Sequence, residues 1–258
     1  MTLPPMPLSS SSPVLLVTGG GRGIGAAIAI AAAAAGHAVA VNYHRDEGSA
    51  HSVVQRIVAA GGKAVALQAD VAQEDQVLRL FAAVDQTLGR LTGLINNAGM
   101  LAPQMRVEDM SAARLQQVLA TNVIGCFLCA REAVRRMARS RGGAGGAIVN
   151  LSSMAAKLGA PGEYVDYAAS KGAVESMTIG LAKEVATEGI RVNGIRPGLI
   201  HTDIHASGGE PGRVQRLEAS VPMGRGGEPE EVAAAALWLL SDAASYCTGT
   251  FIDVSGGR

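Results

Sequence analysis

Short apolar segments alternate with helical patterns along almost the whole chain of 258 residues. Each apolar segment has the length of a buried strand, and the stretches between them have the one-sided apolar spacing or the Ala-rich composition of helices. This alternation predicts a single α/β domain with a doubly wound, Rossmann-type parallel sheet of about seven strands, whose sites lie at the carboxyl ends of the strands. The predicted strands are 14–17, 37–42, 63–69, 93–95, 147–151, 190–195 and 250–254, and the predicted helices are 46–60, 73–88, 107–139, 167–187 and 229–240, after an Ala-rich helix that ends near residue 35.

The chain divides into a short tail and one domain. Residues 1–13 are rich in Pro and Ser and lack the basic start and apolar centre of a secretory signal, so we expect a disordered tail on a cytoplasmic protein. Residues 14–258 form the predicted domain. Within it, 201–227 is long, polar and glycine-containing, which is typical of a loop that closes over a substrate.

Composition argues against several classes of function. The chain has 22 basic and 22 acidic residues, and zero net charge argues against a nucleic-acid partner. We find no uninterrupted apolar segment of 18 residues or more with membrane flanks, so no membrane span is predicted. Cys126, Cys129 and Cys247 do not make a disulfide framework, and we interpret the first two as small buried residues one helical turn apart, with no metal site.

The first predicted strand runs into the glycine-rich stretch Thr18–Gly25, and a helix follows it. Strand, glycine loop and helix form the context of a dinucleotide site, because glycines let the backbone approach a pyrophosphate and the helix N-terminus attracts its charge. The stretch is not a P-loop, since no Gly-Lys-Ser/Thr ends it. Arg22 stands at the positive end of the helix, where an anionic ligand would explain a cation.

The end of the second predicted strand bears on the choice of cofactor. In NAD-specific sites an acid near the end of this strand bonds the ribose 2′-hydroxyl. Here the strand ends in Asn42-Tyr43-His44-Arg45, and Asp46 lies farther along. The missing acid, with Arg45 and Arg22 nearby, favours the 2′-phosphate of NADP over NAD. We therefore expect Asn42, Tyr43 and Arg45 to bind this part of the cofactor.

Tyr167 and Lys171 are four residues apart in a predicted helix and share one of its faces. A free phenol titrates near pH ~10, and a nearby ammonium favours its ionised form, which suits a tyrosine to acid–base work near neutrality. The pair alone is a weak signal, since a packed Tyr beside a solvated Lys has the same spacing. Its weight comes from the residues predicted at one edge of the sheet, which are Gly19, Asp70, Asn97, Ser153, Pro197 and Thr202.

Taken together, these motifs resemble those of the short-chain dehydrogenase/reductase family over residues 13–257. The matching motifs are Thr18–Gly25, Asn96–Gly99, Asn122, Ser152-Ser153, Tyr167–Lys171, Arg191–Asn193 and Pro197-Gly198. More narrowly, residues 159–167 resemble a bacterial branch of uncharacterised, glucose-dehydrogenase-like oxidoreductases. The resemblance implies an NAD(P)-dependent enzyme that acts on CH–OH or C=O groups of a small molecule.

The resemblance also implies a role for each motif. Tyr167 would be the general acid/base, Lys171 would hold the nicotinamide ribose, Ser153 would hydrogen-bond the substrate oxygen, and Asn122 would anchor a water that passes protons to Lys171. The implied cofactor contacts are Gly19, Gly21, Arg22, Ile24 and Gly25 at the pyrophosphate, Asp70 and Val71 at the adenine, Asn97, Ala98 and Gly99 at the adenosine ribose, and Pro197, Gly198, Ile200 and Thr202 at the nicotinamide amide, beside Tyr167 and Lys171.

One spacing departs from the family. The serine is often thirteen residues before the tyrosine, which is the position of Met154, whereas Ser153 is fourteen before Tyr167. A loop longer by one residue accounts for Ser153, and Ser152 is the alternative. We favour interpreting Ser152 as a small residue packed at a strand end.

The leading hypothesis is an NADP-dependent carbonyl reductase or alcohol dehydrogenase. The alternatives are an NAD-preferring sugar or polyol dehydrogenase, a sugar-nucleotide epimerase, which usually needs a larger substrate domain, and a non-catalytic dinucleotide sensor. The intact catalytic set argues against the sensor. Glu163, Asp166, His201 and His205 could line a polar pocket, although each also fits a solvated loop residue.

The predicted helix 229–240 is apolar almost all round. One sheet covers only one side of a helix, so this helix needs a second cover. Gly172, Ala173, Ser176 and Gly180 on helix 167–187 allow close approach of a second helix across a two-fold axis. We therefore expect a homo-oligomer, and the family implies a homotetramer.

Overall fold

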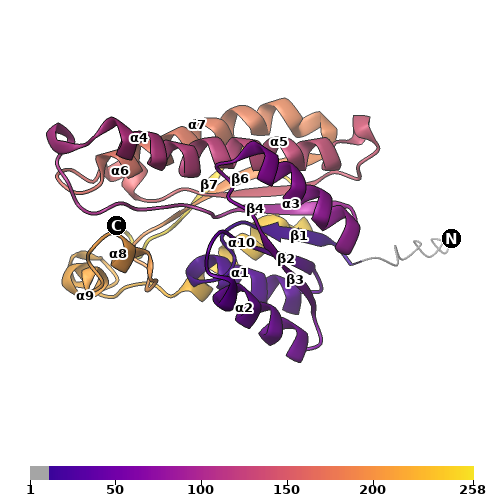
Figure 1. The fold of residues 1–258 in the computed structure, drawn as a ribbon, viewed down its shortest axis with the longest axis horizontal. Helices are drawn as coiled ribbons and strands as arrows, with labels where there is room; N and C mark the ends of the chain where they lie inside the picture. The colour runs from indigo at the N-terminus through magenta and orange to yellow at the C-terminus, as the bar shows by residue number, and fades with distance from the viewer. Residues whose placement is uncertain (1–11) are drawn as a thin grey trace.

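The computed structural model describes residues 12–258, so the predicted tail lies almost entirely outside the described residues. The described chain forms a seven-stranded parallel sheet in the order β3-β2-β1-β4-β5-β6-β7 (Figure 1). This confirms the predicted doubly wound parallel sheet. The strands are β1 (Val14–Val17), β2 (Ala38–Tyr43), β3 (Lys63–Gln68), β4 (Leu91–Asn96), β5 (Gly146–Leu151), β6 (Ile190–Pro197) and β7 (Phe251–Val254).

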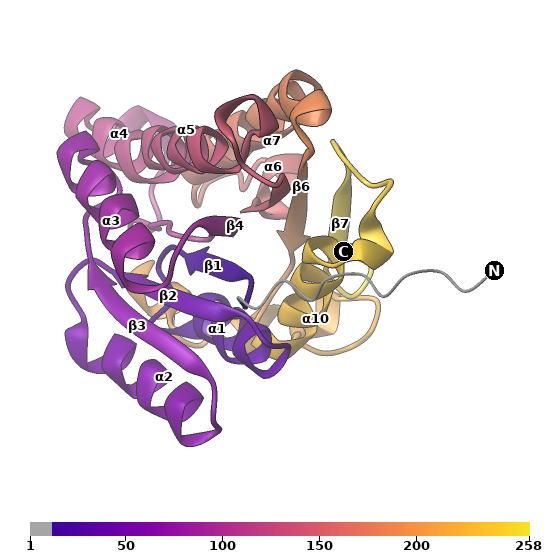
Figure 2. The same ribbon diagram turned by 90° about the vertical axis from the view of Figure 1, so that its right-hand side faces the viewer.

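Helices cover both faces of the sheet (Figure 2). Successive residues of a strand point to opposite faces, so Leu15 and Val17 of β1 join one apolar core and Val14 and Leu16 join the other. The helices on the first core are α1 (Gly23–Ala34), α2 (Glu47–Ala59) and α10 (Pro229–Leu240). Those on the second are α3 (Glu74–Thr87), α5 (Gly125–Met137) and α7 (Val165–Val185).

The helix predicted at 107–139 begins later than expected and is interrupted. Val107–Asp109 is a separate 3₁₀ turn, and the helix begins after Ser111, whose hydroxyl oxygen accepts a hydrogen bond of 3.2 Å from the Arg114 amide. That N-cap satisfies an amide at the helix start and fixes the boundary. From there the helix contains α4 (Ala112–Leu119), a π-turn at Ala120–Ile124, and α5.

The same segment, Ala112–Met137, is long and apolar enough to cross a membrane by length and composition alone. In this fold, Cys129, Ala133 and Met137 are fully buried in the core between α5 and the sheet. Packing against the sheet thus accounts for the apolar composition. Cys126 and Cys129 are buried free cysteines, as predicted, and burial raises the pKa of the Cys126 thiol to about 12.

The long segment 201–227 is more structured than a loop. It contains α8 (Ile204–Ser207), α9 (Arg213–Leu217) and a 3₁₀ turn at Glu218–Ser220. The short helices lie together beyond the sheet edge in Figure 1. Its two ends are held by a bridge between Ile200 and Gly227, so the segment leaves and returns at one place. We call residues 201–227 the lid.

Candidate active site

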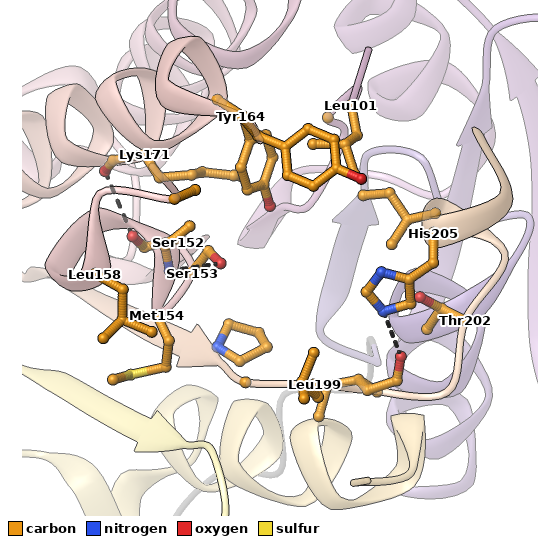
Figure 3. Close-up of a pocket in the computed structure, with 18 of the residues that line it drawn as sticks. Leu101, Ser152, Ser153, Met154, Leu158, Tyr164, Lys171, Leu199, Thr202 and His205 are labelled. Carbon is orange, nitrogen blue, oxygen red and sulfur yellow. Dashed lines mark hydrogen bonds between the residues drawn. The ribbon is translucent and has the colours of Figure 1, made fainter. Parts of the chain in front are cut away.

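A cavity of about 360 Å³ opens at the carboxyl ends of the strands, between α7 and the lid (Figure 3). It is lined by many of the residues that the sequence singled out for the cofactor and the substrate. These are Ile24, Asn97, Gly99, Ser153, Tyr167, Lys171, Pro197, Gly198, Ile200 and Thr202. Residues from five separate parts of the chain therefore meet at one hollow.

Lys171 is buried beside Tyr167 in the middle of this cavity wall. Its ammonium lies 5.5 Å from the centre of the Tyr167 ring, and the residue is 5% exposed. The ammonium donates a hydrogen bond of 2.6 Å to the carbonyl oxygen of Leu151, and no carboxylate of residues 12–258 forms an ion pair with it. Lys171 therefore places a buried cation beside the Tyr167 ring.

The two serines after β5 have different environments. Ser152 is 3% exposed, and its hydroxyl donates to a carboxylate oxygen of Glu175 at 2.8 Å. Ser153 is half-buried, and its hydroxyl oxygen accepts a bond of 3.1 Å from the Ala155 amide, which leaves its proton free to donate into the cavity. The structure thus supports Ser153 as the residue that meets a substrate oxygen and Ser152 as the packed residue.

Asn122 lies in the π-turn and connects α7 to the loop after β4. Its side-chain oxygen accepts from the Met100 amide at 2.8 Å, and its side-chain nitrogen donates to the Met100 carbonyl and to the Ser170 hydroxyl at 3.1 and 3.0 Å. Ser170 in turn donates to the Tyr167 carbonyl at 2.7 Å. Both side-chain N–H groups of Asn122 are therefore engaged within the fold, and the backbone of the π-turn offers a further place to hold a water. A π-turn interrupts the regular helical ladder and so makes such backbone groups available.

The buried side chains of Asn96, Asn150 and Thr178 position α7 against the strands. Asn96 of β4 donates to the Asn150 oxygen of β5 at 2.9 Å, and Asn150 donates to Thr178 of α7 at 2.8 Å. Each buried polar group is satisfied, so these bonds fix one register among the three elements. Sequence reasoning did not assign a role to Asn150 or Thr178.

The glycine loop fits a cofactor that approaches its backbone. Gly19 has φ +60°, which favours glycine. A Cβ at Gly25 would collide with the Gly19 carbonyl oxygen and with the side-chain amide nitrogen of Asn97. Thr18 and Asn97 fix the loop to β4, since the Thr18 hydroxyl oxygen accepts from the amides of Asn97 and Ala98, both at 3.0 Å. Thr202 of the lid reaches the same loop, with its methyl group 3.2 Å from a Cβ built at Gly23.

The end of β2 presents basic side chains and no free carboxylate. Arg22 and Arg45 are exposed, and neither forms a side-chain hydrogen bond or ion pair with the described residues. Asp46 instead caps α2, because its carboxylate accepts from the Ser49 amide at 3.0 Å and from the Ser49 hydroxyl at 2.6 Å, bonds that lower the pKa of Asp46.

Asn42 at the end of β2 is engaged within the protein. Its side-chain oxygen accepts from the Gly19 amide at 3.2 Å, and its nitrogen donates to the carbonyls of Leu67 and Ala69 at 3.2 and 3.1 Å. This geometry supports a role for Asn42 in holding the glycine loop in place. Asp70 is also held locally, since its carboxylate accepts from the Ala72 amide at 3.0 Å, and Val71 is 5% exposed.

Four residues were named for a polar pocket, and the structure separates them. Glu163 and His205 line the cavity, whereas Asp166 and His201 do not. Asp166 is 7% exposed, and its carboxylate lies 2.8 Å from the Arg114 guanidinium. The Nε2 atom of His201 lies 3.9 Å from a carboxylate oxygen of Glu228.

Sequence reasoning missed Arg213 and Tyr164, which both line the cavity. Arg213 of α9 contacts both carboxylate oxygens of Glu163, at 2.5 and 3.0 Å, and its guanidinium lies 5.2 Å from the Tyr164 ring centre. Arg213 also pairs with Glu210, whose pKa is lowered to about 2 by hydrogen bonds first with Arg216 and then with Arg213. No local sequence signal marks Arg213, because its partners are fifty residues away or within the loop predicted at 201–227.

The glycine loop, the Tyr–Lys pair and the serine at one sheet edge define a dinucleotide-dependent oxidoreductase. Comparison with known proteins agrees: the sequence model of the family described as enoyl-(acyl carrier protein) reductase matches residues 19–258. The chain belongs to the short-chain dehydrogenase/reductase family, whose members use nicotinamide cofactors and act on CH–OH or C=O groups.

Relatives of this chain carry several activities in their names. It is 58% identical over 245 residues to an uncharacterized oxidoreductase, YgfF, of Escherichia coli K12, covering 95% of this chain and 99% of that protein. It is 38% identical to glucose 1-dehydrogenase 2 of Bacillus subtilis (85% and 84% covered) and 39% identical to a 3-oxoacyl-[acyl-carrier-protein] reductase of Synechocystis (95% and 96%).

Solved structures of the family share the whole fold. A short-chain type dehydrogenase/reductase from Mycobacterium marinum matches with a TM-score of 0.89 and 35% identity, covering 96% of this chain and 95% of that chain. A dehydrogenase/reductase from Sinorhizobium meliloti matches with a TM-score of 0.88 and 32% identity, covering 96% of both.

Proposed function

We propose that this protein is an NADP-dependent carbonyl reductase or alcohol dehydrogenase that uses Ser153, Tyr167, Lys171 and Asn122. The observation that carries the proposal is that Ser153 and Tyr167 line one cavity beside a buried Lys171 that has no ion-pair partner among residues 12–258. When bound, the cofactor supplies or accepts a hydride. The protein must therefore orient the substrate carbonyl and manage the proton on its oxygen.

Each catalytic side chain has one task in this proposal. Ser153 donates a hydrogen bond to the substrate oxygen and so orients the carbonyl, because its hydroxyl proton is free. Tyr167 holds the proton that the oxygen gains during reduction, and it takes that proton back during oxidation. Lys171 stabilises the ionised Tyr167 oxygen and donates to the cofactor ribose. Asn122 holds the π-turn whose backbone anchors a water leading to Lys171.

The end of β2 supports NADP. Arg22 and Arg45 stand exposed and unpaired among the described residues, and Asp46, the acid that follows Arg45 in the chain, is engaged in capping α2. Two free guanidinium groups match a 2′-phosphate, to which arginine makes charge-assisted bonds. Tyr43 completes this end, Asp70 and Val71 would meet the adenine, and the main alternative is an NAD-preferring sugar or polyol dehydrogenase.

A screen of the purified protein tests the proposal. Carbonyl compounds are offered with NADPH or NADH, and alcohols with NADP or NAD, and the change in nicotinamide absorbance is followed. The proposal requires turnover of at least one carbonyl or alcohol, faster with the phosphorylated cofactor. Tight cofactor binding without turnover of any compound would favour the non-catalytic sensor instead.

We further propose a cytoplasmic homotetramer. In a single chain, Trp238 of α10 is 42% exposed, and Ile179 of α7 and Phe127 of α5 are 41% and 51% exposed. Gly172 and Gly180 of α7 have no atom within 4 Å of a Cβ built on them, so a second helix has room to approach. In the proposed tetramer, the exposed face of α10 and the exposed face of α5 and α7 pack against further copies of the chain. This packing removes the apolar surface of both faces from water.

A further inference from the structure

His205 of α8 has its ring in the cavity, on the side opposite the reacting groups. Figure 3 shows the ring reaching in from the lid, across the hollow from Ser153 and Lys171. The residue is only 9% exposed. A molecule whose reacting oxygen meets Ser153 therefore has its other end near His205.

The tautomer of His205 is set by a backbone carbonyl. Its Nε2 lies 3.1 Å from the carbonyl oxygen of Ile200. A carbonyl oxygen only accepts, so Nε2 carries the proton and donates it. A neutral imidazole has one N–H, and Nδ1 is then left with a bare lone pair that can only accept.

Nδ1 of His205 has no hydrogen-bond partner. Among residues 12–258 it is the one buried side-chain nitrogen or oxygen in this condition. The atom has almost no surface open to solvent, so bulk water does not satisfy it either. Buried polar atoms of folded proteins are nearly always paired, and an exception calls for a ligand or a functional reason.

The charge of His205 stays neutral in this setting. Burial lowers its pKa, the Ile200 carbonyl and Glu210 act in the opposite direction, and Arg213 and His201 add to the lowering. A neutral ring at neutral pH keeps Nδ1 as an acceptor. A ligand that satisfies it must bring a hydrogen-bond donor.

The other polar groups of this corner are already engaged. Arg213 and Arg216 are paired with Glu163 and Glu210, so two positive and two negative charges cancel. The Tyr164 hydroxyl is 3.4 Å from the Gly208 carbonyl. Leu101, Leu199 and Ile204 supply apolar surface, and the other charged lining residues of the cavity are Lys171, at the reacting side, and Arg258. The corner thus fits an uncharged group with one donor on an otherwise apolar body.

We propose that Nδ1 of His205, opened to the cavity by a small shift of the lid on binding, accepts a hydrogen bond from a hydroxyl group of the substrate, at the end away from the reacting carbon. The substrate class is then an uncharged hydroxy-ketone, or the corresponding diol, with a short apolar frame between the two oxygens. This inference rests on the proposed function, which places the reacting oxygen at Ser153. It makes His205 a specificity-determining residue that takes no part in proton transfer.

Three ketones of one shape test the idea: 4-hydroxycyclohexanone, 4-methoxycyclohexanone and 4-methylcyclohexanone. The first offers a donor to His205, the second only an acceptor, and the third neither. We expect kcat/KM for the hydroxy compound to exceed that for the methoxy compound by about tenfold, because the methoxy compound leaves Nδ1 unpaired. Equal values, or a preference for the methoxy compound, would overturn the inference without any variant.

His205→Gln is the matched variant. Its amide nitrogen can keep the bond to the Ile200 carbonyl, and no acceptor then stands at the position of Nδ1. We expect the hydroxy-over-methoxy ratio to fall to about one, mostly through loss of the hydroxy compound. His201→Gln is the control, since His201 is the neighbouring lid histidine that pairs loosely with Glu228, and it should keep the wild-type ratio. An unchanged ratio in His205→Gln overturns the inference.

Calorimetry separates this inference from the proposed function. Binding of 4-hydroxycyclohexanone to the cofactor-bound wild type and to His205→Gln is compared without turnover. A dissociation constant about tenfold higher in the variant supports the His205 contact even where catalysis is slow. Equal binding rejects it, whereas failure of every carbonyl and alcohol in the screen rejects the proposed chemistry.

Discussion

The ammonium of Lys171 donates a 2.6 Å hydrogen bond to the carbonyl of Leu151, the last residue of β5. This bond holds the lysine side chain between the sheet and α7, so its charge stays close to the Tyr167 ring. Strand β5 also leads directly into Ser152 and Ser153. One strand end therefore places both the cation and the serine, while α7 supplies the tyrosine.

The Tyr167→Phe variant should lose turnover and keep cofactor binding. Only the phenolic hydroxyl transfers a proton, so we expect kcat to fall by about 10²-fold or more. Steady-state kinetics on a substrate from the screen and a fluorescence titration with NADPH measure the two properties. A variant that retains more than a few per cent of kcat would show that Tyr167 is not the acid/base.

Alanine at Ser153 and at Ser152 should separate catalysis from packing. Ser153→Ala removes the donor to the substrate oxygen, and we expect kcat/KM to fall by about 10²-fold with little change in stability. Ser152→Ala removes the bond to Glu175 and should lower the free energy of unfolding by about 1 kcal/mol while kcat stays near the wild-type value. Kinetics and urea unfolding of both variants check this, and the opposite pattern would make Ser152 the catalytic serine.

Arg45→Ala should weaken NADPH and leave NADH almost unchanged. Loss of a charge-assisted bond to the 2′-phosphate costs about 1–3 kcal/mol of binding free energy. Arg56→Ala is the control, because Arg56 is an exposed arginine in the last turn of α2. Calorimetric titration of all three proteins with both cofactors decides. Equal losses for NADPH and NADH, or a wild-type preference for NADH, would count against a phosphate site at Arg45.

Glu163→Gln should loosen the lid and raise KM. Glu163 lies just before α7 and holds Arg213 of α9 through both carboxylate oxygens, and Arg213 is only 10% exposed in its side chain. A neutral amide leaves this buried cation with Glu210 as its remaining close partner. We expect KM to rise severalfold, with kcat changed by less than about twofold, because substrate retention depends on the lid. Hydrogen exchange across 204–217 reports the opening of the lid. An unchanged KM with unchanged exchange would show that the contact between Glu163 and Arg213 does not hold the lid.

The fold followed from the sequence because each strand and helix carries its own apolar pattern. Val14–Val17 and the glycine loop were assigned from local residues, and so was the helix that carries Tyr167. The start of α4 was missed, since an apolar periodicity does not reveal the Ser111 cap that ends the preceding extended segment. The short lid helices were missed for a related reason, because four or five residues are too few to show a period.

Residues of the candidate site could be chosen from the sequence where the chemistry of a side chain suggests a role, but their hydrogen-bond partners could not. Tyr167, Lys171 and Ser153 have side chains whose chemistry suggests their place. Asn42 shows the limit, because its position at a strand end suits a cofactor contact, yet its amide is bonded to Gly19, Leu67 and Ala69. Such pairings join residues 23 to 27 apart in the chain, and only the folded sheet brings them together.

The Gly180→Arg variant should break the oligomer without unfolding the subunit. Within one chain a side chain at Gly180 meets no atom within 4 Å, and arginine suits a helix better than glycine, so the free energy of unfolding of the subunit should not fall. Across a two-fold axis between two α7 helices, the same side chain would clash and bring like charges together. Ala59→Arg, at an exposed position of α2, is the control. Light scattering at micromolar concentration should give four times the 26.2 kDa of one chain for the wild type and the control, and a smaller mass for Gly180→Arg. A wild-type mass near 26.2 kDa would reject the oligomer, and a tetrameric Gly180→Arg would move the interface away from α7.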